Sequence, residues 1–434
     1  MNNFQTILIG IFLALFVFAV LIFSGVINLD NKKESGTLKG NVVIWGTLSS
    51  IDFYKVFETL TETNPDLSVS YIKKDATSYQ QSLIESFATD NGPDLFLITP
   101  DMIAKNKDFI YQIPFASYPE KVFRDSFIEG AEIFIDKEKK EIVAFPIVVD
   151  PMVVYFNKNM FTNEGLVNPP YFWDELLNLN SKLTKRENDG TIRESMIALG
   201  RYDNVNNSKD ILSTLLLQSG NEIIKREGDT YVSTLDIIPQ GSNKSYLETI
   251  LTFLMGFSNS SNTIYSWNKT MPSSFDAFTG GKLALYLGKS SELFKIDATN
   301  PNLSYDVTEM IQTKGMNKRT YGDIYGIAIN KKSKNSGVSF GVASMLTTGE
   351  NAKNFSKALS LPPVLKNLLA EDPSDPYMYS FYKSAIITKS WLDQNPTSTN
   401  QIFRELFDNI LSNKLEMESA ISKAQGQLSK TIIN

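Results

Sequence analysis

The most hydrophobic part of the chain is one uninterrupted run near the N-terminus. Residues 7–27 read ILIGIFLALFVFAVLIFSGVI, which is 21 residues without a charge. A bilayer core of about 30 Å needs about 20 apolar residues in a helix, so the run predicts one transmembrane helix. A cleaved signal peptide is the alternative, but it needs a basic start, a shorter apolar core and a small-residue cleavage site. No Lys or Arg precedes Lys32, and we therefore expect an uncleaved anchor after a tail of residues 1–6.

Polar residues follow this run directly. Residues 28–40 read NLDNKKESGTLKG, a composition that predicts a flexible stalk. Lys32, Lys33 and Lys39 lie on this side of the run, where positive charge favours the cytoplasm. Large domains can be translocated against that bias, so the charges alone leave the orientation of the chain open.

From residue 41 onward, short apolar runs alternate with helical stripes. The runs at 41–45, 67–71 and 94–98 are rich in β-branched and aromatic residues or alternate with polar ones, and they predict strands. Apolar residues recur at helical spacing over 53–60 and 79–88. Strands that alternate with helices in this way are typical of βαβ units and a parallel sheet, so we expect an α/β fold.

Small polar residues follow the predicted strands, and ligands of open parallel sheets bind beyond the carboxyl ends of the strands. The three segments are GTLSS at 46–50, KKD at 73–75 and TPD at 99–101. The candidate ligand-binding residues among them are Thr47, Ser49, Thr99 and Asp101. Each of these alone can equally serve to cap a helix, and only the loops together predict a site.

A lone acid stands inside the most strand-like stretch of the chain. Residues 142–149 and 152–156 are apolar and β-rich, and Asp150 lies between them. Burying a carboxylate is costly unless it has partners. An ionised carboxylate accepts several hydrogen bonds, which suits sugar hydroxyls and equally a cationic amine. The alternative is an exposed acid in a turn before Pro151.

Composition narrows the chemistry that this chain can perform. The 434 residues include no histidine and no cysteine, which excludes a disulfide framework, a thiolate site and a Ser-His-Asp triad. We expect neither a metal nor another cofactor. Lys and Arg number 42 against 48 Asp and Glu, a net charge of −6, and this balance disfavours nucleic acid as a partner.

Four stretches of the chain follow, in order, the sequence motifs of one known protein family. The first holds Pro146, Asp150, Tyr155, Asn157, Lys158 and Phe161, then Gly165, Leu166, Pro169, Pro170, Trp173 and Glu175. Two positions depart from the family's pattern: Phe156 separates the Tyr from the Asn-Lys, and Phe172 stands where Thr is usual. The other stretches are 278–286, 326–335 and 415–432. By these stretches the chain resembles the maltose-binding-like extracellular solute-binding proteins of ABC importers, and the resemblance covers residues 41–434.

The resemblance implies the two-lobed, periplasmic-binding-protein-like α/β fold, with a ligand cleft between the lobes. Lobe one would comprise residues 41–149 and about 322–360, and lobe two about 150–321 and 361–434. The lobes would close around a carbohydrate or similar polar solute and deliver it to membrane permease subunits. The binding domain would then lie outside the cell, anchored to the lipid bilayer by the single span at 7–27.

Candidate ligand contacts combine the strand-end residues with the acid and with aromatic rings that can stack on a sugar. They are Trp45, Thr47, Ser49, Thr99, Asp101, Asp150, Tyr155, Tyr202, Ser290, Tyr321, Tyr325 and Trp391. The resemblance supports Asp150, because the matching acid lies on a segment that crosses between the lobes. For each aromatic residue taken alone, packing in the core is the simpler interpretation.

Three other functions are alternatives to solute capture. A receptor ectodomain of the same fold would sense a solute without transporting it. A glycoside hydrolase needs two carboxylates, and nothing in the sequence places a second acid opposite Asp150. The triplet Gly288-Lys289-Ser290 is similar to the end of a phosphate-binding loop, but Leu283 stands where that motif needs glycine. We therefore expect a binding protein and not an enzyme.

Overall fold

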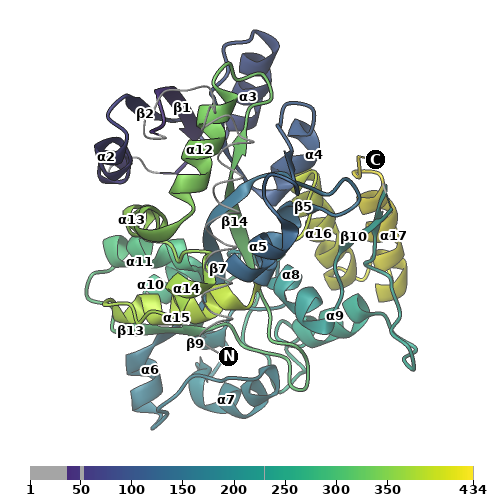
Figure 1. Cartoon of the computed structure of the whole chain (residues 1–434). Helices are drawn as coiled ribbons and strands as arrows, with labels where there is room; N and C mark the ends of the chain where they lie inside the picture. Colours follow the sequence, from purple (N-terminus) through teal and green to yellow (C-terminus); the bar gives the residue numbers. More distant parts are fainter. Residues whose placement is uncertain (1–36, 49–52, 229, 434) are drawn as a thin grey trace, which may run out of the picture. The chain divides into compact units, whose positions relative to one another are not determined.

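The computed structural model describes residues 37–48, 53–228 and 230–433 (Figure 1). The predicted membrane span at 7–27, most of the predicted stalk and Ser49 lie outside these residues. Within the described part of the chain, no helix combines the length and the apolar character that crossing a membrane requires.

The chain divides into two compact units and passes between them three times. Unit 1 comprises the described residues up to Val148 together with Ile324–Leu368, and unit 2 comprises Val149–Asp323 with the residues from Leu369 onward. We predicted changes of lobe after residues 149, 321 and 360, and the chain changes unit after residues 148, 323 and 368.

The sheet of unit 1 contains the three strands predicted from the sequence. β1 (Gly40–Gly46) pairs in parallel with β2 (Leu67–Lys73) on one side and with β3 (Leu95–Ile98) on the other. α2 (Phe53–Thr63) and α3 (Tyr79–Ala88) form the two connections, which confirms the predicted βαβ pattern. The return strand β14 (Thr320–Ile329) joins the sheet antiparallel to β3 through its unit 1 residues.

The alternation of the sequence explains why these segments form a sheet against helices. Val42 and Ile44 point to the buried side of β1, and Phe53 at the start of α2 is 2% exposed. The Phe53 ring stacks on Phe355 at a centroid distance of 4.8 Å and meets the edge of Tyr71 at 4.3 Å. Aromatic contacts of this kind add to the free energy gained from burying apolar area.

The remaining elements of unit 1 are short except for two helices, α12 and α13. They are η1 (Pro100–Met102), α4 (Ile103–Asn106), β4 (Ile113–Pro114), α5 (Glu120–Ser126), η2 (Glu129–Phe134), β5 (Ile135–Asp136), β6 (Glu141–Ile142), α12 (Ser336–Leu346) and α13 (Gly349–Leu359). α14 (Lys366–Leu369) contains the third change of unit.

Unit 2 is built on β7 (Phe145–Asn157), which runs without a break through Asp150 and Pro151. The alternative of an exposed acid in a turn is therefore wrong, since Asp150 is 4% exposed within a continuous strand. β12 (Leu283–Lys289) pairs antiparallel with β7 and parallel with β9 (Ile192–Ile197). β13 (Tyr305–Glu309) lies antiparallel to β7.

Helices and short strands complete unit 2. They are α6 (Lys158–Asn163), η3 (Trp173–Glu175), α7 (Leu176–Leu183), β8 (Lys185–Arg186), α8 (Ser208–Ser219), β10 (Ile224–Glu227), β11 (Thr230–Ser233), α9 (Tyr246–Gly256), α10 (Ser274–Thr279), η4 (Ser290–Glu292), α11 (Leu293–Thr299), α15 (Pro376–Ile386), β15 (Thr388–Lys389), α16 (Pro396–Leu411) and α17 (Met417–Ser429). The last stretch that carries the resemblance, 415–432, contains α17.

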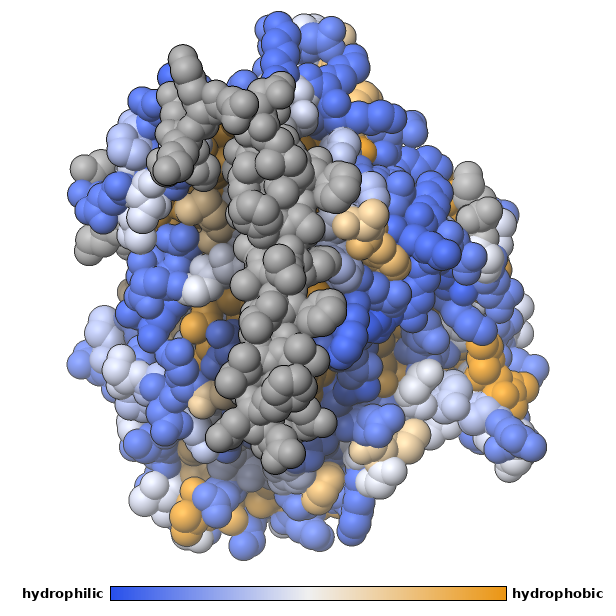
Figure 2. Space-filling view, in the orientation of Figure 1, coloured by the Kyte–Doolittle hydropathy of each residue, from blue (hydrophilic) through white to orange (hydrophobic). Residues whose placement is uncertain are grey.

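The face drawn in Figure 2 is mostly hydrophilic over the described residues, with hydrophobic residues in small separate groups. The core of unit 2 gathers large side chains that are withdrawn from water, among them Trp267, Tyr155, Tyr286, Phe161 and Phe257. Burial of these large apolar side chains is therefore a main source of the stability of unit 2.

A glycine in β14 allows the strand to approach β7 closely. A Cβ at Gly322 would lie 2.9 Å from the carbonyl oxygen of Asp150 and 2.9 Å from the Cα of Pro151. We expect Gly322→Ala to destabilise the chain by about 1–3 kcal/mol, because backbone atoms cannot move aside as a flexible side chain can. Urea unfolding measures this change.

Gly426 is the matched control, since it lies inside α17 and a Cβ there meets nothing within 4 Å. Gly426→Ala should stabilise the chain by about 0.5–1 kcal/mol, because alanine favours helix and loses less entropy on folding. Equal stability of the two variants would contradict the close approach at Gly322.

Candidate functional site

The acid singled out in the sequence lies at the centre of a hydrogen-bonded cradle. The Ser290 hydroxyl donates to Asp150 Oδ1 at 2.7 Å, and the Ser291 backbone N–H donates to the same oxygen at 2.9 Å. The Ser291 hydroxyl donates to Asp150 Oδ2 at 2.6 Å. The end of β12 and the start of η4 thus satisfy both oxygens of a carboxylate on β7. Two predicted residues, Asp150 and Ser290, are in direct contact.

Burial dominates the protonation of this carboxyl group. Removal from water raises the pKa of Asp150, because the charged form loses hydration. The positive charge of Lys289 and the hydrogen bonds from Ser291 act in the opposite direction without cancelling the effect. The pKa of Asp150 therefore lies above its ordinary value.

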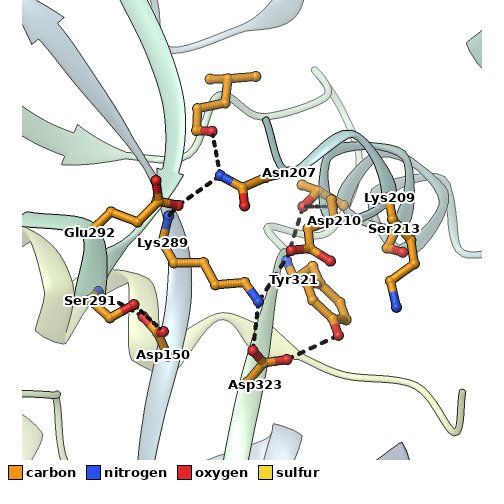
Figure 3. A network of polar contacts seen from close by, with 12 residues as sticks. Asp150, Asn207, Lys209, Asp210, Ser213, Lys289, Ser291, Glu292, Tyr321 and Asp323 are labelled. Atoms are coloured by element: carbon orange, nitrogen blue, oxygen red, sulfur yellow. Dashed lines mark hydrogen bonds and ion pairs between the residues drawn. The ribbon is translucent and has the colours of Figure 1, made fainter. Parts of the chain in front are cut away.

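Beside the cradle, one lysine joins acids from two other elements (Figure 3). Lys289 Nζ at the end of β12 lies 2.6 Å from Asp323 Oδ2 on β14 and 3.2 Å from Asp210 Oδ2 on α8. The exposed fractions of the three side chains are 20% for Lys289, 27% for Asp323 and 10% for Asp210. An ammonium group with two carboxylate partners at this depth is a strong, charge-assisted contact.

The protonation of this group follows from its partners. Burial acts to lower the pKa of Lys289, but the charges of Asp323 and Asp210 outweigh burial and hold it well above its ordinary value. Burial raises the pKa of Asp323, but Lys289 outweighs burial and lowers it overall. Burial raises the pKa of Asp210 in spite of Lys289. Lys289 therefore stays charged at neutral pH.

A second lysine of the same unit pairs with another acid, and its charge also interacts with those of Asp210 and Asp323. Lys209 Nζ lies 2.8 Å from Asp393 Oδ2, and Thr399 donates to Asp393 Oδ1 at 2.7 Å. Asp393 is 3% exposed. Further along the network, Asn207 donates to Glu292 at 2.7 Å and so ties the start of α8 to η4.

Three charged residues of this network, Lys289, Asp210 and Asp323, were not predicted as site residues from the sequence. Lys289 was considered only as part of a phosphate-loop mimic, although it does end a strand. Asp323 carried a usable signal, because it is a lone acid in the apolar run TYGDIYGIAI, as Asp150 is in its own strand. Asp210 gave no comparable signal, because an acid in the first turn of a helix is common.

The predicted aromatic residues of unit 2 are parts of its core. Tyr155 is fully buried, and its hydroxyl donates to the Lys289 carbonyl at 2.7 Å. The Tyr202 hydroxyl donates to Asn400, and the Trp391 indole N–H donates to Ser213 at 3.1 Å. Tyr321 is 7% exposed and donates to Asp323 at 3.1 Å. In this structure these rings support the site from inside.

The predicted residues of unit 1 keep more access to solvent. Trp45, Thr47, Thr99, Asp101 and Tyr325 are all intermediate in exposure. β1 pairs with β3, so Thr47 and Thr99 follow neighbouring strands at the same edge of the sheet, as the parallel pattern requires. The ammonium group of Lys74 lies 3.5 Å from the centroid of the Trp45 ring, a cation–π contact on one face of the indole. Ser49 lies outside the described residues.

The acids of the described residues are arranged for hydrogen bonds and ion pairs. Among these residues, no cluster of three or more His, Cys, Asp or Glu could hold a metal ion. The groups present can accept hydrogen bonds from hydroxyls, donate ammonium protons and offer flat rings, which is the chemistry of binding a polar molecule.

A known family matches most of the chain. The model described as "Bacterial extracellular solute-binding protein" matches residues 49–353. A candidate binding protein of Brucella abortus is 21% identical over 354 residues, covering 79% of each chain, and one of Brucella suis matches equally well.

Solved structures extend the likeness over nearly the whole chain. A cyclo/maltodextrin-binding protein in complex with maltotetraose has a TM-score of 0.70 at 15% identity, covering 92% of this chain and 98% of its own. A cyclic α-maltosyl-1,6-maltose-binding protein of Arthrobacter globiformis has 0.73 at 14%, covering 91% and 99%. A protein with mannobiose bound has 0.64 at 19%, covering 89% and 99%. At these identities the likeness is one of fold, and the fold is two-lobed α/β.

The raised pKa of Asp150 predicts a pH dependence with a definite sign. Between the unfolded value, about 3.9, and the higher folded value, the folded chain binds a proton that the unfolded chain does not. The stability of the natural chain relative to Asp150→Asn should therefore rise as the pH falls through the folded pKa, and level off below about pH 4. Urea unfolding of both proteins from pH 7 to pH 4 measures the difference.

Subtracting the free energies of unfolding of the two proteins cancels the contributions of the titratable groups that they share. A difference between Asp150→Asn and the natural chain that falls with falling pH would mean that the pKa is lowered instead.

Proposed function

This chain belongs to the bacterial extracellular solute-binding protein family, and from that premise we propose that it captures a carbohydrate or similar polar solute without changing it chemically. The observation that carries the proposal is the family match over residues 49–353. Two of the proteins that share the fold were solved with maltotetraose or mannobiose bound, which supports an oligosaccharide as the solute.

We place the first contacts of the solute on unit 1. Trp45, Thr47, Thr99, Asp101 and Tyr325 combine partial exposure with rings, hydroxyls and a carboxylate, and sugars are bound by this mixture. Lys74 covers one face of Trp45, so a sugar ring would either displace that ammonium group or use the other face. The buried Asp150, Ser290 and Tyr321 would support the site from within unit 2.

Capture would proceed by closure of the two units around the solute, because a ligand shifts a conformational equilibrium only by its differential affinity for the two states. The closed form would be the one recognised by the permease subunits of an ABC importer. We propose that residues 7–27 anchor the chain in the cell membrane with the binding units outside the cell. Anchoring would raise the effective concentration of the binding units near the permease.

Thermal unfolding with sugars tests the binding proposal. A solute at a hundred times its Kd stabilises the folded chain by about 2.7 kcal/mol. We expect maltotetraose, mannobiose or a related oligosaccharide to raise Tm and to be recovered unchanged. Trp45→Ala should weaken the affinity about tenfold, since a stacked ring contributes about 0.5–1.5 kcal/mol beyond its buried area.

Tyr171→Ala is the matched control, because Tyr171 is an aromatic residue that is 38% exposed on unit 2. It should leave the affinity unchanged. Absence of a Tm shift with a panel of sugars, amines and peptides would count against solute capture. Release of shorter sugars that stops in Asp150→Asn would instead identify a glycoside hydrolase.

Cell fractionation tests the anchor. The full chain should sediment with membranes and resist extraction by high salt and by alkaline carbonate, because a helix of about 20 apolar residues is held by the bilayer core. A chain that starts at residue 37 should be recovered without membranes. Release of the full chain by salt alone, or recovery of a form cut after the apolar run, would contradict an uncleaved anchor.

A further inference from the structure

Two of the three places where the chain changes unit lie next to a largely buried acid. β7 enters unit 2 at Val149, and Asp150 is the next residue. β14 leaves unit 2 after Asp323. Both carboxylates belong to unit 2, and both lie in the strands that covalently connect it to unit 1. The third change of unit lies within α14, between Leu368 and Leu369.

One turn of three consecutive residues holds both of these acids. Ser290 and Ser291 donate three hydrogen bonds of 2.6–2.9 Å to Asp150. Lys289, the residue before them, forms the 2.6 Å ion pair with Asp323. Because the three residues are covalently continuous, the acid of β7 and the acid of β14 cannot move apart without breaking one set of contacts (Figure 3).

Other contacts make this turn a fixed point of unit 2. Tyr155, near the C-terminal end of β7, donates a 2.7 Å hydrogen bond to the Lys289 carbonyl. Lys289 also pairs with Asp210 at 3.2 Å, which ties the turn to the first turn of α8. Glu292 accepts from the Lys289 backbone N–H at 3.0 Å. A carboxylate held by such a turn has little freedom of its own.

We propose that the Lys289–Ser291 turn is a positioning element that fixes how β7 and β14 leave unit 2, and so limits the range of arrangements that the two units sample. Lys289 is its central residue, because it alone reaches both β14 and α8. The expected effect of the turn on affinity rests on the proposed solute capture, whereas its expected effect on the arrangements of the two units does not. In this proposal the arrangements that the turn retains are those that can close on a solute, and apparent affinity rises with the fraction of molecules in such arrangements.

The chain is well suited to a direct measurement, because it has no natural cysteine. Glu85→Cys on α3 of unit 1 and Thr252→Cys on α9 of unit 2 are exposed positions for two spin labels. Pulsed electron–electron double resonance on the full chain in detergent then gives the distribution of distances between the two labels, one on each unit. The variants are Lys289→Met, which removes the ammonium group, and Lys289→Arg, which keeps a positive charge.

Lys209→Met is the matched control. Lys209 has nearly the same side-chain exposure as Lys289, 19% against 20%, and pairs with a buried acid in the same unit. Its partner Asp393 lies in neither connecting strand. Both Met variants should lower Tm, so a loss of stability alone does not distinguish them.

Of the two Met variants, only Lys289→Met should broaden the distance distribution in the absence of any solute, and Lys289→Arg should keep most of the natural width. Ser291→Ala, which removes the 2.6 Å contact to Asp150, should broaden it as well, and it keeps the test decisive if Lys289→Met does not fold. Equal widths in Lys289→Met and Lys209→Met, or in Ser291→Ala and the natural chain, would overturn the proposal.

Affinity provides an independent readout with maltotetraose as the probe. Lys289→Met should bind it about threefold to tenfold more weakly than Lys209→Met does, because a smaller fraction of molecules is competent to close. If maltotetraose did not bind the natural chain, the proposal of an oligosaccharide of this kind as the solute would be contradicted, but the distance measurement would remain valid. A broadened distribution with unchanged affinity would overturn the link between the turn and closure.

Discussion

The Lys289 side chain is four-fifths withdrawn from water, and the structure of unit 2 around the connecting strands depends on how its charge is compensated. Two carboxylates, on β14 and on α8, supply that compensation. Removing one partner of a buried pair typically costs about 3–5 kcal/mol, because the other charge remains buried alone. The positions of three elements are therefore linked: β12 carries the lysine, and β14 and α8 carry the acids that it requires.

The backbone pattern was predictable where it depends on neighbours in sequence. The spacing of apolar residues over 41–98 predicted β1 to β3 with α2 and α3, and the structure confirms them. Periodicity reports which face of an element is buried, and that information is local. The contacts of the site are not local. Lys289 meets an acid 34 residues away, and Asp150 meets serines about 140 residues away.

Residue type alone also could not separate aromatic rings that pack from rings that are accessible. Tyr155 and Trp45 have the same combination of flat face and polar group, yet one is fully buried and the other is half-buried at a strand end. The difference depends on which strand each residue occupies and on what covers it. Asp150 was predictable as special, because a carboxylate in an apolar run needs partners. Its partners were not predicted, because Ser290 was expected to contact the ligand and its hydrogen bond to Asp150 joins residues far apart in the sequence.

The network of unit 2 is satisfied by its own residues, and this has a consequence for recognition. Asp150 has hydroxyl and amide donors on both oxygens, and Asp323 and Asp210 have Lys289. A solute that took over any of these contacts would have to break one of similar strength, so little binding free energy would be gained. Trp45, Thr47 and Thr99 of unit 1 are half-buried, and a solute can reach them without dismantling the network of unit 2. This contrast is the physical reason for proposing the first contacts of the solute on unit 1.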